Sequence, residues 1–135
     1  MSGKPQVLLY SEDPILTEAV FKAAGMDFRN FVVDSYINPY SALRRLSGIP
    51  KDHYTLAVLE CPSHITGLLL RSTAEKGVHV IAITSDEDNY WLKQYSTNVT
   101  VYSTVAQCPV PSKEQLLCWV YFWAERQLNL RLTPP

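Results

Sequence analysis

Short apolar runs alternate with longer stretches of helical character along the whole of this 135-residue chain. The apolar runs are rich in Val, Ile, Leu and Tyr, which predicts β-strands. The stretches between them repeat apolar side chains every three or four residues, which predicts helices. Strands are predicted over residues 6–10, 31–33, 54–59, 78–84 and 99–102.

Pro, Gly and short polar side chains predict where the helices begin and end. Asp13 is a predicted N-cap with Pro14 at the first helical position, and Gly25 is the predicted stop. Ser112 is the predicted N-cap of the last helix, and Gln115 is its capping-box partner. Helices are therefore predicted over residues 14–24, 39–46, 67–76, 89–95 and 112–128.

Strands that alternate with helices need crossover connections, which bring successive strands together in a parallel sheet. Strands covered on both faces are continuously apolar, as LLY, LAVL and VIAI are in this chain. We therefore predict an α/β fold: a single doubly wound (βα)5 domain with a flavodoxin-like, five-stranded parallel sheet in the order 2-1-3-4-5. Residues 1–130 are the predicted domain, and residues 131–135 are the start of a linker or the end of the chain.

Charge and hydropathy narrow the classes of partner. The net charge of −1 gives no electrostatic basis for direct binding to nucleic acid or to an anionic membrane. No apolar run approaches the ~20 residues of a membrane span, and the first residues do not have the pattern of a signal peptide. Three cysteines without a C-x-x-C pair fit free thiols in the cytoplasm, and we expect Cys61, Cys108 and Cys118 to be buried.

Polar side chains gather where the predicted strands end. In a parallel α/β sheet, ligands bind beyond the carboxyl ends of the strands. Carboxylates from two strands with a hydroxyl nearby would suit a hard cation such as Mg²⁺. The three histidines share no metal-ligand spacing, so no zinc site is predicted. The side chains at this edge are Ser11, Glu12 and Asp13 after the first strand, Glu60 and Cys61 after the third, Thr84 and Ser85 after the fourth, and Ser103 and Thr104 after the fifth.

Three segments of the chain resemble those of response-regulator receiver domains. VLLYSEDPIL is similar to the family's first strand and acidic turn, and YTLAVLEC to its third strand, which ends at the phospho-accepting Asp. VHVIAITS is similar to the fourth strand, whose end carries a Thr or Ser. The closing helix stands where the family has its fifth helix. Because their order and spacing agree, the resemblance implies a signalling domain and not an enzyme.

The chain departs from the family at the residues that carry phosphoryl transfer. The acidic pair falls on Ser11 and Glu12, so one acid is missing, although Asp13 could partly replace it. The acceptor position falls on Glu60, whose carboxylate stands one methylene further out. No Lys occurs in residues 98–112, where the family has one. The resemblance therefore implies an atypical, or pseudo-, receiver that binds Mg²⁺ weakly, transfers phosphate inefficiently and has no cofactor.

Several of these positions have two interpretations. Glu60 either holds the domain in an active-like state by its charge or is a solvated carboxylate at a decayed site. Thr84 is either the family's switch hydroxyl or a cap of the helix that follows. Tyr102 stands near the family's rotating aromatic switch, although aromatic side chains at strand ends more often pack in the core. Together, the residues at the positions of the family's phosphoryl-transfer site form a predicted degenerate phosphorylation site: Ser11, Glu12, Asp13, Glu60, Thr84 and Ser85.

The last predicted helix carries more apolar side chains than one buried face requires. A surface helix has an apolar stripe of ~100°, whereas apolar residues surround this helix for two turns. Either its aromatic side chains close the core, or they form a partner interface with the fourth helix and fifth strand, the usual dimerisation and output surface of receivers. The presence of Tyr and Trp favours the interface, because these residues are enriched at protein–protein contacts. The predicted interface residues are Tyr90, Trp91, Tyr95, Trp119, Phe122 and Trp123.

The sequence thus favours a non-catalytic, phosphorylation-independent, receiver-like signalling domain. The resemblance implies the cytoplasmic, N-terminal regulatory part of a bacterial response regulator or transcription regulator, acting as a homodimer or by docking a partner protein. DNA would be bound only through an effector domain after Pro135. One alternative is a small flavodoxin-like enzyme or cofactor-binding domain, with Cys61 as a nucleophile in one variant, although the two acids of SEDP would repel phosphate. Another is a genuine receiver phosphorylated on Asp13.

Overall fold

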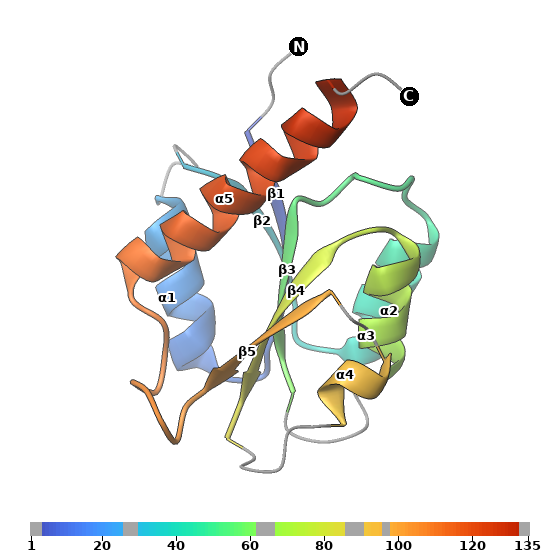
Figure 1. The fold of residues 1–135 in the computed structure, drawn as a ribbon. Coiled ribbons are helices and arrows are strands. Elements are labelled where there is room, and N and C mark those ends of the chain that lie inside the picture. The colour runs from blue at the N-terminus through green and yellow to red at the C-terminus, as the bar shows by residue number, and fades with distance from the viewer. Residues whose placement is uncertain (1–3, 26–29, 62–66, 86–90, 96–97, 133–135) are drawn as a thin grey trace.

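A computed structural model describes residues 4–25, 30–61, 67–85, 91–95 and 98–132 of the chain. Strands and helices alternate through these residues (Figure 1). The strands are β1 (Gln6–Tyr10), β2 (Val32–Tyr36), β3 (Leu56–Glu60), β4 (His79–Thr84) and β5 (Val99–Ser103). The helices are α1 (Pro14–Ala24), α2 (Pro39–Ser47), α3 (Gly67–Glu75), α4 (Leu92–Tyr95) and α5 (Lys113–Leu132).

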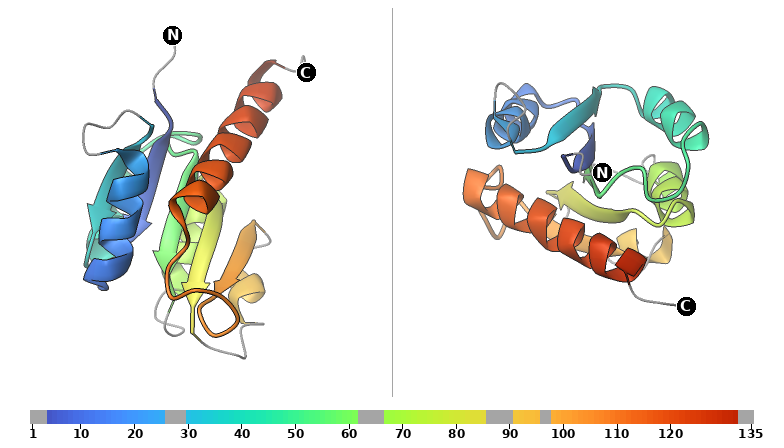
Figure 2. Two further views of the ribbon diagram at one scale, coloured as in Figure 1. Left: turned by 90° about the vertical axis from the view of Figure 1, so that its left-hand side faces the viewer. Right: turned by 90° about the horizontal axis from the view of Figure 1, so that it is seen from above.

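The five strands form one parallel sheet in the order β2-β1-β3-β4-β5, which confirms the predicted doubly wound fold. Helices α1 and α5 cover one face of the sheet, and α2, α3 and α4 cover the other (Figure 2). Along β1, Val7 and Leu9 pack toward α1 and α5, whereas Leu8 and Tyr10 pack toward α2 and α3. This alternation is the two-residue period of a strand that is buried on both faces.

The predicted caps of α1 and α5 are confirmed. Asp13 Oδ1 accepts a hydrogen bond from the Ile15 N–H at 2.9 Å, and Pro14 opens α1. Gly25 ends α1 with a φ of 82°, a conformation that a side chain would disfavour. Ser112 Oγ accepts a hydrogen bond from the N–H of Gln115 at 3.1 Å. The turn after β1 is therefore held by its own helix cap.

Two predicted ends differ from the structure by three residues or more. Strand β2 runs to Tyr36, beyond the predicted end at residue 33, because its polar residues also pair with β1 at the edge of the sheet. Helix α5 continues to Leu132, past the predicted end at residue 128 and into the segment assigned to a linker, since no Gly or Pro interrupts it. Within the described residues, α4 begins at Leu92; residues 89–90, where its start was predicted, lie outside them.

Candidate functional site

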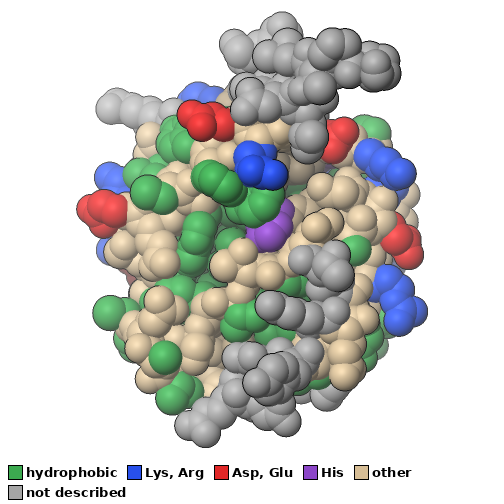
Figure 3. Space-filling model, in the orientation of Figure 1, with side chains coloured by type: hydrophobic (Ala, Val, Ile, Leu, Met, Phe, Trp, Pro, Cys, Tyr) green, Lys and Arg blue, Asp and Glu red, His purple; other side chains and the backbone are tan. Residues whose placement is uncertain are grey.

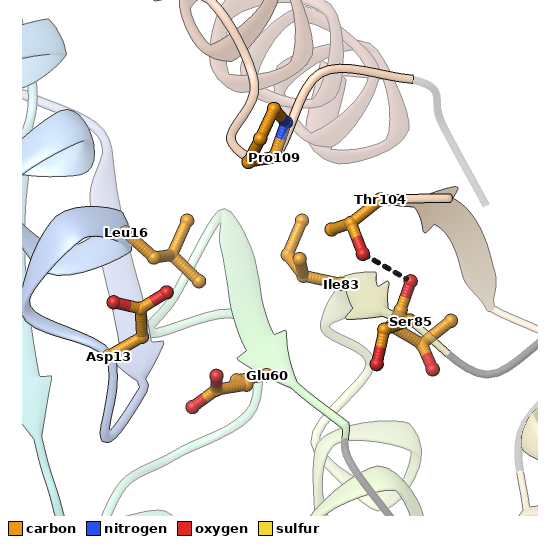
Figure 4. Close-up of a pocket in the computed structure, with 8 residues that line it drawn as sticks. Asp13, Leu16, Glu60, Ile83, Ser85, Thr104 and Pro109 are labelled. Atoms are coloured by element: carbon orange, nitrogen blue, oxygen red, sulfur yellow. Dashed lines mark hydrogen bonds between the residues drawn. The ribbon is translucent and has the colours of Figure 1, made fainter. Parts of the chain in front are cut away.

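A pocket of about 260 Å³ opens at the carboxyl edge of the sheet (Figure 4). Four residues of the degenerate phosphorylation site line it, namely Asp13, Glu60, Thr84 and Ser85. The strand topology thus brings together residues from the ends of β1, β3 and β4, as the sequence predicts. The remaining lining residues are Leu16, Ile83, Thr104 and Pro109.

The carboxylate of Glu60 is tied to the turn after β1. Its Oε1 accepts a hydrogen bond from the Glu12 N–H at 2.9 Å and another from Ser11 Oγ at 3.3 Å. Ser11 is buried, and its Oγ also accepts a hydrogen bond from the Asp13 N–H at 2.9 Å. Because Glu is one methylene longer than Asp, its carboxylate can reach from β3 to this turn. Glu60 therefore joins two strand ends, a role that neither interpretation of the sequence included.

The other two acids also have protein partners. Asp13 caps α1 as described above, and the Tyr10 hydroxyl donates a hydrogen bond to Glu12 Oε2 at 2.8 Å. Burial and the neighbouring Glu12 raise the pKa of Tyr10, so this hydroxyl remains a donor. No group of three His, Cys, Asp or Glu side chains within the described residues is arranged to hold a metal ion. Glu12, Asp13 and Glu60 therefore each accept a hydrogen bond from a protein group.

Thr84 lies at the end of β4 and is almost fully buried. Its backbone carbonyl accepts hydrogen bonds from Thr104, at 2.9 Å from the N–H and at 3.4 Å from Oγ1 (Figure 4). Ser85 is exposed beside it. Residues 86–90, where Thr84 would act as a helix cap, lie outside the described residues, so both interpretations of Thr84 stay predictions.

Tyr102 on β5 packs in the core. Its side chain is 3% exposed, and its hydroxyl donates a hydrogen bond to the Cys108 carbonyl at 2.7 Å. The ring meets Trp119 edge to face, with 5.9 Å between the ring centroids. Burial raises the pKa of Tyr102, which keeps the hydroxyl protonated. The side chain therefore fastens the segment between β5 and α5 to the sheet.

The predicted partner interface is only partly at the surface. Trp91 is 6% exposed and belongs to the core between the sheet and α2, α3 and α4, so its placement at an interface was wrong. Tyr95 is half-buried beside Trp91, with its ring against the backbone of Gly67. Tyr90 lies outside the described residues. A sequence pattern cannot separate these roles, because a four-residue helix is too short to define a buried face.

On α5 the aromatic side chains divide between core and surface. Trp119 and Trp123 are half-buried, and Trp123 stacks on the His79 ring with 3.7 Å between centroids. Burial lowers the pKa of His79 to about 4, so the imidazole in this stack is neutral at pH 7. Phe122 is 52% exposed, and Tyr121 next to it is also exposed. Figure 3 shows hydrophobic side chains gathered over α5 and β5.

The three cysteines also divide between the core and the surface. Cys61 is fully buried at the end of β3, as expected, and its N–H donates to the Ile83 carbonyl at 2.8 Å. Cys108 and Cys118 are exposed, so the expectation that they are buried was wrong. Cys108 lies in the segment after β5, and Cys118 lies on α5.

Comparison with solved structures finds receiver domains of response regulators repeatedly. The signal receiver domain of an HD domain-containing protein from Pseudomonas fluorescens Pf-5 aligns over 94% of this chain and 99% of its own, with 16% identity and a TM-score of 0.69. An atypical orphan response regulator, described as phosphorylation-independent, aligns over 89% of this chain and 95% of its own, with 11% identity and a TM-score of 0.66. A de novo designed Rossmann 2x3 protein aligns over 90% of both chains, with 14% identity and a TM-score of 0.62.

Sequence comparison adds no assignment, because no protein-family profile and no curated protein matches the chain. None of the helices in the described part of the chain is long and apolar enough to cross a membrane. At 11–16% sequence identity, these structural similarities show the fold alone, and a designed protein has the same fold. The chain has the doubly wound fold of response-regulator receiver domains.

Proposed function

We propose that this chain is a non-catalytic, receiver-like signalling domain that works without phosphoryl transfer. One observation carries the proposal: the carboxylate at the acceptor position, Glu60, is engaged by the Glu12 N–H and by Ser11 Oγ. Both hydrogen bonds go to Oε1, so the carboxylate is held against the turn after β1. Among the described residues that line the pocket there is no Lys or Arg to neutralise a transferred phosphoryl group.

The fold neighbours support the same proposal. Receiver domains recur among them, and one neighbour is described as a phosphorylation-independent regulator. In this proposal the chain is the regulatory part of a response regulator, and any contact with DNA would come from a separate effector domain.

The decisive experiment treats the purified protein with acetyl phosphate and Mg²⁺ and measures its intact mass. We expect no phosphoryl adduct. A genuine receiver of known activity, treated in parallel, shows that the reagent is competent. A stoichiometric adduct on Glu60 or Asp13 would overturn the proposal, and digestion of the adduct would locate it.

The output surface in this proposal is the face formed by α4, β5 and α5, which binds a second copy or a partner protein. Phe122 is exposed on α5, and Thr100 is exposed on the adjacent edge strand β5. Large aromatic side chains are enriched at such contacts, and an edge strand offers unpaired backbone groups beside them. Trp119 and Trp123 pack α5 against the sheet beside this surface, through their contacts with Tyr102 and His79.

A further inference from the structure

A second pocket, of about 380 Å³, lies along α2 and shares no lining residue with the degenerate phosphorylation site. Four of its lining residues belong to α2 or its C-cap and follow each other at intervals of three, one and three residues. Residues with this spacing lie on one face of a helix. Tyr36, at the end of β2, completes the lining. The four helix residues are Ser41, Arg44, Arg45 and Gly48.

The lining is positively charged and rich in hydrogen-bond donors. Two guanidinium groups and the hydroxyls of Ser41 and Tyr36 belong to it, and no acid does. Asp34 lies close by, but its charge is matched by Arg45, whose Nε is 3.8 Å from Asp34 Oδ2. Arg44 forms no ion pair with any of the residues that the structure describes. One positive charge in the pocket is therefore left without a counter-charge.

The guanidinium of Arg45 is held in place by its neighbours. Its Nε donates to the Tyr54 hydroxyl at 3.2 Å, and that hydroxyl donates to Asp34 Oδ2 at 2.6 Å. Tyr54 itself is 1% exposed, so this chain of hydrogen bonds is anchored in the core. The side chain of Arg45 therefore loses less conformational entropy when a ligand binds than a freely moving surface arginine would lose.

We propose that this pocket binds a phosphate monoester. Guanidinium groups present paired N–H donors that match phosphate oxygens, and the two hydroxyls supply further donors for the remaining oxygen. The volume accommodates a phosphate together with the group that carries it. The site would give the domain a reversible, non-covalent response to phosphate esters, and it stands whether or not the carboxyl edge transfers phosphate.

The test is a titration of ¹⁵N-labelled protein, followed by NMR, with two probes that carry the same phosphate on different groups. Ribose 5-phosphate represents a small metabolite, and N-acetyl-phosphoserine amide represents a phosphorylated peptide. We expect saturable shifts of the amides of Ser41, Arg44 and Gly48 with at least one probe. The tighter probe identifies the source of the phosphate. If neither probe shifts these amides at about 10 mM, a concentration far above any specific affinity, the proposal is wrong.

Three variants test whether the probes bind at this pocket or are attracted only by the overall charge of the protein. Arg44→Gln removes the unpaired charge without disturbing Tyr54 or Asp34, and we expect it to weaken binding about tenfold. Arg44→Lys keeps the charge but loses the paired donors, so it should restore the affinity only in part. Lys22→Gln removes one charge from α1 on the opposite face of the sheet and should leave the affinity within about twofold.

Two results would contradict the proposal. Equal weakening by Arg44→Gln and Lys22→Gln would show that only net charge attracts the probes. Equal affinity for sulfate and for the two esters would show a general anion site in place of a phosphate monoester site. Thermal unfolding of each variant, measured beside the titrations, shows whether it is folded.

Discussion

The carboxylate of Glu60, at the end of β3, accepts a hydrogen bond of 2.9 Å from the backbone N–H of Glu12 in the turn after β1. This contact joins two segments that are 48 residues apart, at the position to which the resemblance to receiver domains assigns the phospho-acceptor. It explains why a Glu suits this position: its side chain stabilises the turn that the cap of α1 also shapes.

The length of the Glu60 side chain should therefore affect the stability of the fold. We expect Glu60→Ala to lower the free energy of unfolding by about 1–2 kcal/mol, because the Glu12 N–H and Ser11 Oγ lose an acceptor. Glu60→Gln keeps one acceptor oxygen and should cost less. Glu60→Asp keeps the charge but not the reach, so it should resemble the alanine variant in urea unfolding. A fully stable Glu60→Asp protein would contradict this account.

The hydroxyl of Tyr102 should stabilise the segment between β5 and α5. Tyr102→Phe keeps the ring against Trp119 and removes only the hydrogen bond to the Cys108 carbonyl, so we expect a loss of about 1 kcal/mol. Tyr121→Phe is the matched control, because it removes a 3.0 Å hydrogen bond to Asn30 at an exposed position. Tyr121→Phe should lower the free energy of unfolding by less than Tyr102→Phe does in the same experiment. Equal losses of free energy would argue against the role of Tyr102.

The half-buried imidazole of His79 should make the protein less stable in mild acid. Its pKa is about 4 in the folded chain, below the ordinary value of 6.5. Well above pH 6.5 the group is neutral in both states and contributes nothing to the pH dependence. As the pH falls from 6.5 toward 4, the unfolded chain binds the proton first, so the free energy of unfolding decreases.

NMR titration of the His79 ring checks this directly, and urea unfolding at pH 7 and pH 5 measures the consequence. His79→Phe keeps an aromatic ring under Trp123 but cannot be protonated, so the difference between the two pH values should shrink in this variant. A ring that titrates near pH 6.5 would contradict the prediction.

Gly67 should tolerate no side chain while Tyr95 is present. A Cβ at this position would stand 2.6 Å from Tyr95 Cζ, so Gly67→Ala must displace the ring or the start of α3. We expect a loss of about 1–3 kcal/mol, as for other overpacked sites. In a double-mutant cycle, Tyr95→Ala should remove most of the penalty of Gly67→Ala. Additive losses would show that Tyr95 is not the obstacle.

The self-association of the domain should depend on the exposed part of α5. We expect a dimer by light scattering at micromolar concentrations, and Phe122→Ser should shift it toward the monomer. Ile15→Ser on α1 is the matched control, because Ile15 is also an exposed large apolar residue, at 65%. A wild-type protein that stays monomeric would refute the homodimer, and equal effects of both variants would refute the choice of surface.

The sequence by itself determined the fold and the place of the site. Strand and helix periodicities are local, and parallel connectivity then leaves few ways to order five strands. The helix caps at Asp13 and Ser112 could be predicted because a cap needs only residues close in sequence. The acids at the strand ends met at one edge because all the strands run the same way.

Only the tertiary structure decided what those side chains do. The reach of Glu60 to Glu12, the burial of Trp91 and the stacking of His79 on Trp123 depend on which element stands opposite, across tens of residues. The same holds for the α2 pocket, since the sequence shows two adjacent arginines but not the core tyrosine, Tyr54, that holds one of them. Local patterns set the backbone, whereas partners distant in sequence fix the orientation of polar and aromatic side chains.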